Sequence, residues 1–169
     1  MATKLGYGWS IKGEKKIVAT TAGKNRINMI ATLNAQTLKL VTTFPETVNS
    51  ETLGEHFVRL RRSYPRTKFS TLHIILDQGS YCVSKTTQIV AARLGIKLRH
   101  LLPYSPNLNL IERAWKVMNE QVRDNVYFLN EKVFVSTIKD FFLNRWSNLS
   151  RSLTTRFADN FQVIQQPAF

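Results

Sequence analysis

Residues 101–116 read Leu-Leu-Pro-Tyr-Ser-Pro-Asn-Leu-Asn-Leu-Ile-Glu-Arg-Ala-Trp-Lys. Two prolines and two asparagines make a stiff polar turn after a short apolar run, and helical spacing begins at Leu110. The acid Glu112 is therefore predicted in the first turn of a helix, behind a loop that fixes its position. A lone carboxylate in that place raises the question of what it faces.

The stretch before this turn alternates between strands and helices. An apolar run over residues 72–76 predicts a strand buried on both faces, and it ends directly before Asp77. A helix is predicted over residues 84–94, because Gly95 suits the left-handed position just past a helix end. A second strand is predicted over residues 96–101. This part of the chain is thus predicted as βαβα, with a parallel pair of strands.

The first 65 residues favour a different arrangement. Residues 1–13 contain three glycines and predict an irregular or hairpin start. Three β-rich runs separated by short polar turns then predict an antiparallel meander. They span residues 16–21, 26–33 and 38–44. A helix capped by Asn49 or Ser50 follows and ends before Pro65.

The remainder of the chain is predicted to be helical. The Glu112 helix and a helix over residues 130–144 each carry an apolar stripe, and a short basic helix is expected over 150–157, before a tail at 165–169. The stripes consist of Ile111, Ala114 or Trp115, Met118 and Val122 in the first helix, and Val133, Phe134, Ile138, Phe141 and Phe142 in the second. We find no repeat or linker, so residues 1–169 are expected to form one domain.

Charge is the unusual feature of the composition. Lys and Arg number 24 against 11 for Asp and Glu, which gives a formal net charge of +13. Such a field favours a polyanion such as nucleic acid over a merely solvated basic surface. No apolar run approaches the length of a membrane span, and no signal-peptide pattern begins the chain, so we expect a cytoplasmic protein without a membrane partner.

Two acids are predicted to meet at one end of the sheet. Asp77 follows the first parallel strand and Glu112 lies on the helix after the second, and the carboxyl ends of parallel strands meet at one edge. Paired carboxylates on a basic protein suit Mg²⁺, which takes one or two protein carboxylates together with phosphate oxygens. Each acid also has an ordinary explanation, since Asp is common in turns and Glu favours the first turn of a helix.

Other reactive side chains are predicted to be structural. Cys82 is the one cysteine, so no internal disulfide forms, and a small half-buried side chain is its expected role. His56, His73 and His100 lack the spacing of metal ligands. No glycine-rich phosphate loop follows a strand, which argues against an enzyme with a nucleotide cofactor.

The turn over residues 103–115 resembles the Pro-Tyr-Ser-Pro-x-Leu-Asn-x-Ile-Glu-x-x-Trp signature of the IS630/Tc1/mariner transposases. The 34 residues between Asp77 and Glu112 match that family's Asp-34-Glu spacing, and Gly8-Trp9 with Lys12-Gly13 is similar to the IS630 branch. The resemblance implies an RNase H-like fold with a mixed sheet, an antiparallel meander followed by parallel βαβα. It also implies that Asp77 and Glu112 bind Mg²⁺ or Mn²⁺.

The resemblance implies roles for further residues, and the sequence departs from the family pattern in two places. Tyr104, Pro106 and Asn109 would position the loop. Lys12, Arg113 and Lys116 are candidate DNA contacts, and Arg113 and Lys116, which flank Glu112, also have the ordinary explanation of exposed helix charges. A first Asp on a first, central strand is expected upstream of the Gly-Trp segment, as is a helix-turn-helix region, and neither is found, so the first strand is expected to be missing. Asp77 is followed by Gln78-Gly79-Ser80-Tyr81, where many members have Asn and a nearby His.

The function expected from this resemblance is DNA transposition. A metal-dependent endonuclease and strand transferase would act on transposon ends and target DNA, near the nucleoid of a prokaryote, as a homo-oligomer or paired with a full-length transposase. With two of three carboxylates, this chain alone is expected to be inactive. The alternative is a non-catalytic, basic DNA-binding or interaction remnant of a transposase.

Overall fold

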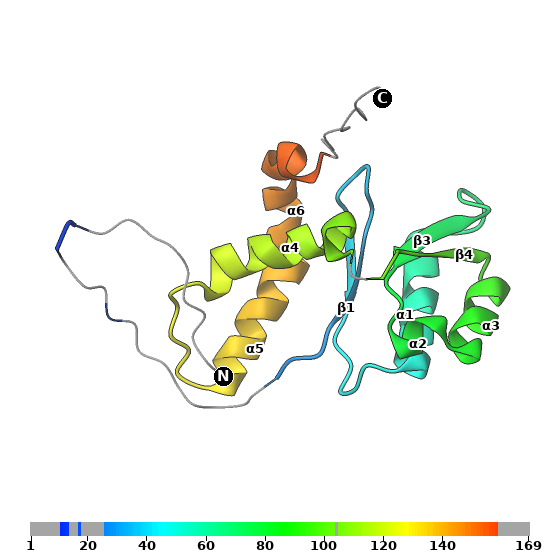
Figure 1. The fold of residues 1–169 in the computed structure, drawn as a ribbon, viewed down its shortest axis with the longest axis horizontal. Coiled ribbons are helices and arrows are strands. Elements are labelled where there is room, and N and C mark those ends of the chain that lie inside the picture. The colour runs from blue at the N-terminus through cyan, green and yellow to red at the C-terminus, as the bar shows by residue number, and fades with distance from the viewer. Residues whose placement is uncertain (1–10, 14–16, 18–25, 104, 159–169) are drawn as a thin grey trace, which may run out of the picture.

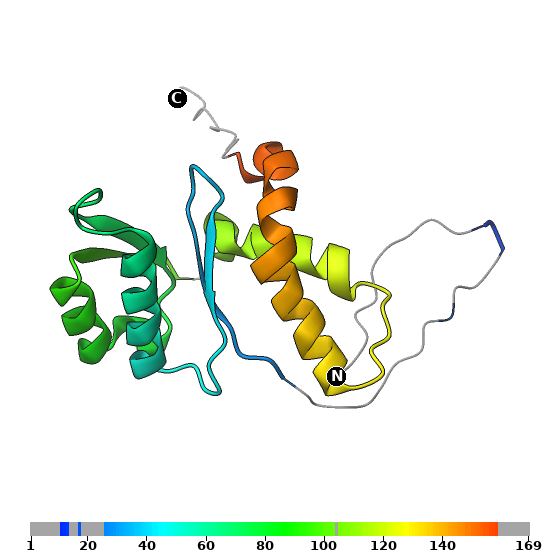
Figure 2. The same ribbon diagram turned by 180° about the vertical axis from the view of Figure 1, so that it is seen from behind.

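The computed structural model describes residues 11–13, 17, 26–103 and 105–158. The predicted start over residues 1–10, most of the run over 16–21, the tail over 165–169 and Tyr104 lie outside the described residues. Figure 1 shows a hairpin, β1 and β2, with helices α4 to α6 on one side of it and the group α1 to α3 with β3 and β4 on the other. Figure 2 shows the same order from behind.

The hairpin confirms two of the three predicted runs of the meander. Strands β1 (Ile30–Leu33) and β2 (Leu40–Thr43) pair antiparallel, with Ile30 opposite Thr43 and Leu33 opposite Leu40. The Asn34 side chain closes the turn by accepting hydrogen bonds from the N–H groups of Gln36 and Thr37, at 2.9 and 2.8 Å. This is the local chemistry that makes Asn a turn residue.

Helix α1 (Ser50–Ser63) begins and ends as predicted. The Asn49 side chain accepts hydrogen bonds from the N–H groups of Glu51 and Thr52, and the Thr52 hydroxyl accepts one from the Asn49 N–H, so a complete capping box starts the helix. The helix ends at Ser63, two residues before Pro65. Its inner side, with Leu53, Phe57 and Leu60 buried, packs between the two pairs of strands.

Strands β3 (Leu72–Leu76) and β4 (Ile96–His100) pair in parallel, as predicted. They are joined by a short helix α2 (Ser80–Val83), which the sequence did not predict, and by α3 (Lys85–Arg93), which is capped by Ser84. Gly95 has a φ of +65°, the conformation that favours glycine after a helix. In addition, the Nη2 atoms of Arg61 and Arg66 would lie 3.1 Å from a Cβ added at Gly95.

The expectation that residues 72–76 are buried on both faces is wrong. Ile74 is 7% exposed and faces α1, whereas Ile75 is 60% exposed and His73 is exposed as well. The apolar run predicted a strand covered on both sides. In the described residues, however, helices cover only the side on which Ile74 lies.

The helical half begins at the proline turn. A 3₁₀ turn η1 (Pro106–Leu108) leads into α4 (Leu110–Met118), which continues as a π-helical turn η2 (Asn119–Arg123). After a loop, α5 (Glu131–Asp140), the π-helical turn η3 (Phe141–Arg145), α6 (Trp146–Leu149) and the 3₁₀ helix η4 (Ser150–Phe157) follow without a break. Most predicted inward residues are buried, but Val133 is 44% exposed because it lies on the outer side of α5.

Two hydrophobic clusters hold the chain together. The helical core joins α4, α5, η3, α6 and η4 with the hairpin residue Leu38, and Leu40 packs against it. The strand core joins α1 to α3 with β3, β4 and the hairpin residue Val41. Neighbouring residues of β2 therefore point into different cores, as the alternation of side chains along a strand requires.

The predicted mixed sheet is present as two separate pairs. Within the described residues, β1 pairs with β2 and β3 pairs with β4, and no ladder of hydrogen bonds joins the two pairs. None of the helices in that part of the chain has the length and apolar character that a membrane span requires.

Candidate active site

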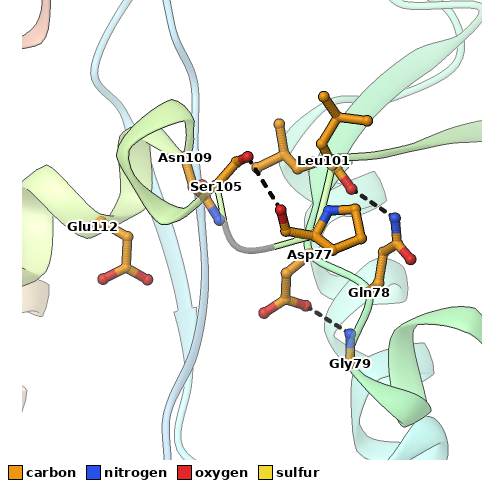
Figure 3. Close-up of a pocket in the computed structure, with 9 residues that line it drawn as sticks. Asp77, Gln78, Gly79, Leu101, Ser105, Asn109 and Glu112 are labelled. Carbon is orange, nitrogen blue, oxygen red and sulfur yellow. Dashed lines mark hydrogen bonds between the residues drawn. The ribbon is translucent and has the colours of Figure 1, made fainter.

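Asp77 and Glu112 line one pocket of about 220 Å³. Asp77 follows β3 directly, and Glu112 is the third residue of α4. The other lining residues come from the turn after β3 and from the proline loop: Gln78, Gly79, Leu101, Leu102, Pro103, Ser105 and Asn109. Figure 3 shows the two acids on opposite sides of this pocket, Glu112 on its helix and Asp77 at the strand end. The structure thus brings together the two predicted site residues.

Hydrogen bonds tie together the ends of the two parallel strands. The Leu101 N–H donates to the Leu76 carbonyl at 2.8 Å, and the Gln78 side chain donates to the Leu101 carbonyl at 2.9 Å. Nδ1 of His100 lies 3.1 Å from the Asp77 carbonyl. These bonds fix the main chain of Asp77 relative to the start of the proline loop.

The Asp77 carboxylate is held by two donors on one oxygen. Its Oδ1 accepts a hydrogen bond from the Gly79 N–H at 3.2 Å and another from the Cys82 thiol at 3.3 Å. Burial, and the hydrogen bond and negative charge of Asp77, raise the pKa of the Cys82 thiol to about 12. The thiol therefore keeps its proton at neutral pH and acts as a donor.

Glu112 is presented to the pocket by the geometry of α4. The Asn109 side chain caps the helix by accepting from the Ile111 N–H at 3.3 Å. Ala114 and Val117 are buried in the helical core, which leaves Glu112 on the exposed side. Partial burial and then the negative charge of Asp77 raise the pKa of the Glu112 carboxyl. The two carboxylates thus interact across the pocket.

Two facing carboxylates can bind a divalent cation. Their oxygens are hard ligands of the kind that Mg²⁺ prefers, and their mutual repulsion is relieved when a cation lies between them. Within the described residues, no group of three or more His, Cys, Asp and Glu side chains could hold a metal ion. Among the described residues, the acids that line the pocket are Asp77 and Glu112.

The other predicted site residues vary in their placement. Arg113 Nη1 donates to the Ala158 carbonyl at 3.1 Å, so this side chain packs along the end of η4. Lys116 and Lys12 are exposed. Asn109 caps α4 and lines the pocket, and Pro106 begins η1.

Sequence reasoning missed the residues that support Asp77. Gln78, Cys82 and His100 all contact Asp77 or the strand end beside it, although Cys82 and His100 were expected to have purely structural roles. The spacing of Asp77 and Cys82 in the sequence could have indicated the contact between them. A helical turn starting just after Asp77 brings a side chain five residues later back toward the acid, but the four-residue α2 was not predicted.

The chain is similar in sequence to known proteins. Residues 1–134 match the family model described as DDE superfamily endonuclease. The chain is 25% identical over 146 residues to the "Insertion element IS630 uncharacterized 39 kDa protein" of Shigella sonnei. That match covers 82% of this chain and 42% of the relative, so the chain spans less than half of that relative's length.

Solved structures show the same fold. The Mos1 transposase paired-end complex with left transposon end matches with a TM-score of 0.57 at 15% identity, over 91% of this chain and 48% of that one. The Mos1 mariner paired end complex with Mn matches with a TM-score of 0.58 at 13% identity, over 92% of this chain and 50% of that one. These likenesses confirm the RNase H-like fold class predicted from the sequence.

Proposed function

The chain belongs to the DDE superfamily endonucleases, and we propose that it is part of the catalytic region of an IS630/mariner-type transposase that acts on DNA. The reaction is hydrolysis of the phosphodiester at the ends of the element, followed by attack of the freed 3′-hydroxyl on target DNA. One observation supports this most directly: Asp77 and Glu112, which are far apart in sequence, line one pocket.

In this proposal the two carboxylates hold a divalent cation, Mg²⁺ or Mn²⁺. A pair of such ions, when bound, would activate the attacking oxygen and stabilise the leaving one. Asp77 contributes the carboxylate oxygen that its two donors leave open, and Glu112 contributes its carboxylate from the opposite side. The chain's own task is to position these oxygens, which the capped α4 and the tied strand ends achieve.

The basic surface supplies the affinity for DNA. The net charge of +13 favours contact with phosphates, and exposed Lys116 lies one helical turn beyond Glu112. Lys12 and the guanidinium of Arg113 are proposed as weaker contributors. DNA binding is therefore expected to weaken steeply as the salt concentration rises.

Full activity is proposed to need a third carboxylate in addition to Asp77 and Glu112. The resemblance to IS630/Tc1/mariner transposases, in which a first Asp completes the set of carboxylates, supports this. The residue would come from a segment outside the described residues or from a partner copy of the transposase. The second candidate function, a DNA-binding protein without catalysis, rests on the net charge of +13 and needs no metal site.

Calorimetric titration with Mn²⁺ tests the proposal. The chain is compared with Asp77→Asn, Glu112→Gln and a matched control, Glu51→Gln, which removes a first-turn acid from the Asn-capped α1, outside the set of residues that line the pocket. Saturable binding that both site variants lose and the control keeps is expected. If the folded chain binds no Mn²⁺ but binds DNA in a salt-dependent way, the second candidate function stands instead.

A further inference from the structure

We infer that Cys82 is a positioning residue for Asp77: its thiol holds one carboxylate oxygen in place so that the other is directed into the pocket. The inference deepens the proposed function and rests on it for the role of Asp77. Sequence reasoning assigned Cys82 only a packing role, and the geometry points to more.

The two hydrogen bonds on Asp77 fall on the same atom. Both the Gly79 N–H, at 3.2 Å, and the Cys82 thiol, at 3.3 Å, donate to Oδ1. In Figure 3, the carboxylate oxygen that is not bonded to Gly79 lies on the side of Glu112. Two donors on one oxygen restrain the rotation of the carboxylate more than a single donor would.

The sulfur itself is held firmly. Cys82 is 5% exposed and packs in the strand core with Ile74. Its N–H donates to the Gly79 carbonyl at 2.8 Å, and the residue before it is anchored by Thr87, whose Oγ1 donates to the Tyr81 carbonyl at 2.7 Å. Thr87 is fully buried, so this anchor is protected from water. The main chain that carries the thiol is therefore fixed beside Asp77.

A packing role and a positioning role predict different behaviour. If Cys82 only fills space, an apolar side chain of similar size replaces it, and metal affinity is unaffected. If its S–H bond orients Asp77, serine keeps the function because its hydroxyl is a donor, whereas alanine and valine lose it. Groups that orient metal ligands in this way commonly change metal affinity by about 10-fold or more when they are removed.

The first measurement needs no metal. Cys82 is the one cysteine of the chain, so the S–H stretching band in the Raman spectrum belongs to it alone. Because a hydrogen bond to a carboxylate lowers the S–H frequency, Asp77→Ala is expected to raise it, whereas Glu112→Gln is expected to leave it unchanged. An S–H band at the same frequency in Asp77→Ala and in the unmodified chain overturns the inference.

The second measurement is the affinity for Mn²⁺. Cys82→Ser is expected to bind within about 2-fold of the unmodified chain, and Cys82→Ala and Cys82→Val about 10-fold more weakly. Val41→Ala is the matched control, because it removes packing from the same core without touching Asp77, and its affinity should be unchanged. Thermal unfolding of each variant shows that it is folded.

The two measurements separate the inference from the proposed function. If the unmodified chain binds no Mn²⁺, the metal proposal fails, and the Raman band still decides whether the thiol bonds to Asp77. If Mn²⁺ binds and Cys82→Ala binds it as tightly as the unmodified chain, the metal site stands and the positioning role is wrong.

Discussion

Gln78 Nε2 donates a 2.9 Å hydrogen bond to the main-chain carbonyl of Leu101. This bond connects the residue after Asp77 to the first residue of the proline loop, and so ties the end of β3 to the start of the segment that leads to Glu112. An exposed hydrogen bond from a side-chain amide contributes about 1 kcal/mol to stability at most, but it restricts the geometry of both chain segments.

We predict that Gln78→Leu weakens Mn²⁺ binding more than it destabilises the fold. Loss of the bond lets the turn after β3 move relative to the loop, so a several-fold weaker affinity is expected with a small change in melting temperature. Gln88→Leu is the matched control, because Gln88 Nε2 donates a similar 2.9 Å bond to the Val83 carbonyl, outside the set of residues that line the pocket. Equal effects of both variants on calorimetric affinity would contradict the prediction.

His56 is predicted to make stability depend on pH. It is fully buried, with Nε2 2.8 Å from the Thr32 hydroxyl and Nδ1 3.0 Å from the Thr43 hydroxyl. Burial, followed by the charge of Arg59, lowers the pKa of His56 to about 4. The unfolded chain takes up a proton near pH 6.5 and the folded chain does not, so stability is complete above pH 6.5 and falls as the pH drops toward 4.

The loss over that interval is expected to be about 3 kcal/mol. Chemical denaturation measured from pH 7 to pH 4 checks this. In His56→Gln, which keeps hydrogen-bonding groups but cannot titrate, the decline between pH 6.5 and 4 should be reduced by that amount. An unchanged decline in this variant would assign the pH dependence to other groups.

Replacing Arg61 is predicted to destabilise the fold, even when lysine takes its place. It is 8% exposed, and its guanidinium donates to the carbonyls of Leu94, Tyr64, Phe69 and Ser70 at 2.7 to 3.0 Å. Lysine cannot reproduce this planar fork of donors, so carbonyls are left without partners. We expect Arg61→Lys to lower the free energy of unfolding by about 2–4 kcal/mol, and Arg62→Lys, at the exposed neighbouring position, to change it little.

Glu112 is predicted to lower stability slightly in the absence of metal. Partial burial and the charge of Asp77 raise the pKa of its carboxyl, so the folded chain binds this proton more tightly than the unfolded chain. Its contribution therefore becomes less favourable as the pH rises from the ordinary pKa of glutamate through the raised value. Glu112→Gln should increase the free energy of unfolding at pH 7 by less than about 1 kcal/mol, since the side chain is largely exposed. A lower melting temperature at pH 7 would refute this.

The sequence predicted well those elements whose ends carry local chemistry. Asn49, Ser84, Asn109 and Asn130 each cap a helix through the side chain, and Gly95 ends α3. The pairing of Asp77 with Glu112 was also predictable, because parallel strands place both at one edge of the sheet. These features depend on neighbours in the sequence or on a fixed topological rule.

The predictions that were wrong or missing concern contacts between residues that are distant in the sequence. The apolar run at Ile75 predicted burial, but burial depends on which element covers a face, and no local pattern records that. The predicted burial of Val133 was wrong for the same reason. The second bond on Asp77 was missed because it needs α2, a single turn too short to show periodicity.

The two carboxylates are carried by elements that pack in different hydrophobic cores. Asp77 follows a strand of the strand core, whereas Glu112 rides on a helix of the helical core, and the two cores share the hairpin strand β2. The distance between the two carboxylates therefore depends on how the strand core and the helical core pack on the shared hairpin. A ligand that binds both acids would link the strand core to the helical core. The two cores would then unfold together, whereas without the ligand each could unfold locally by itself.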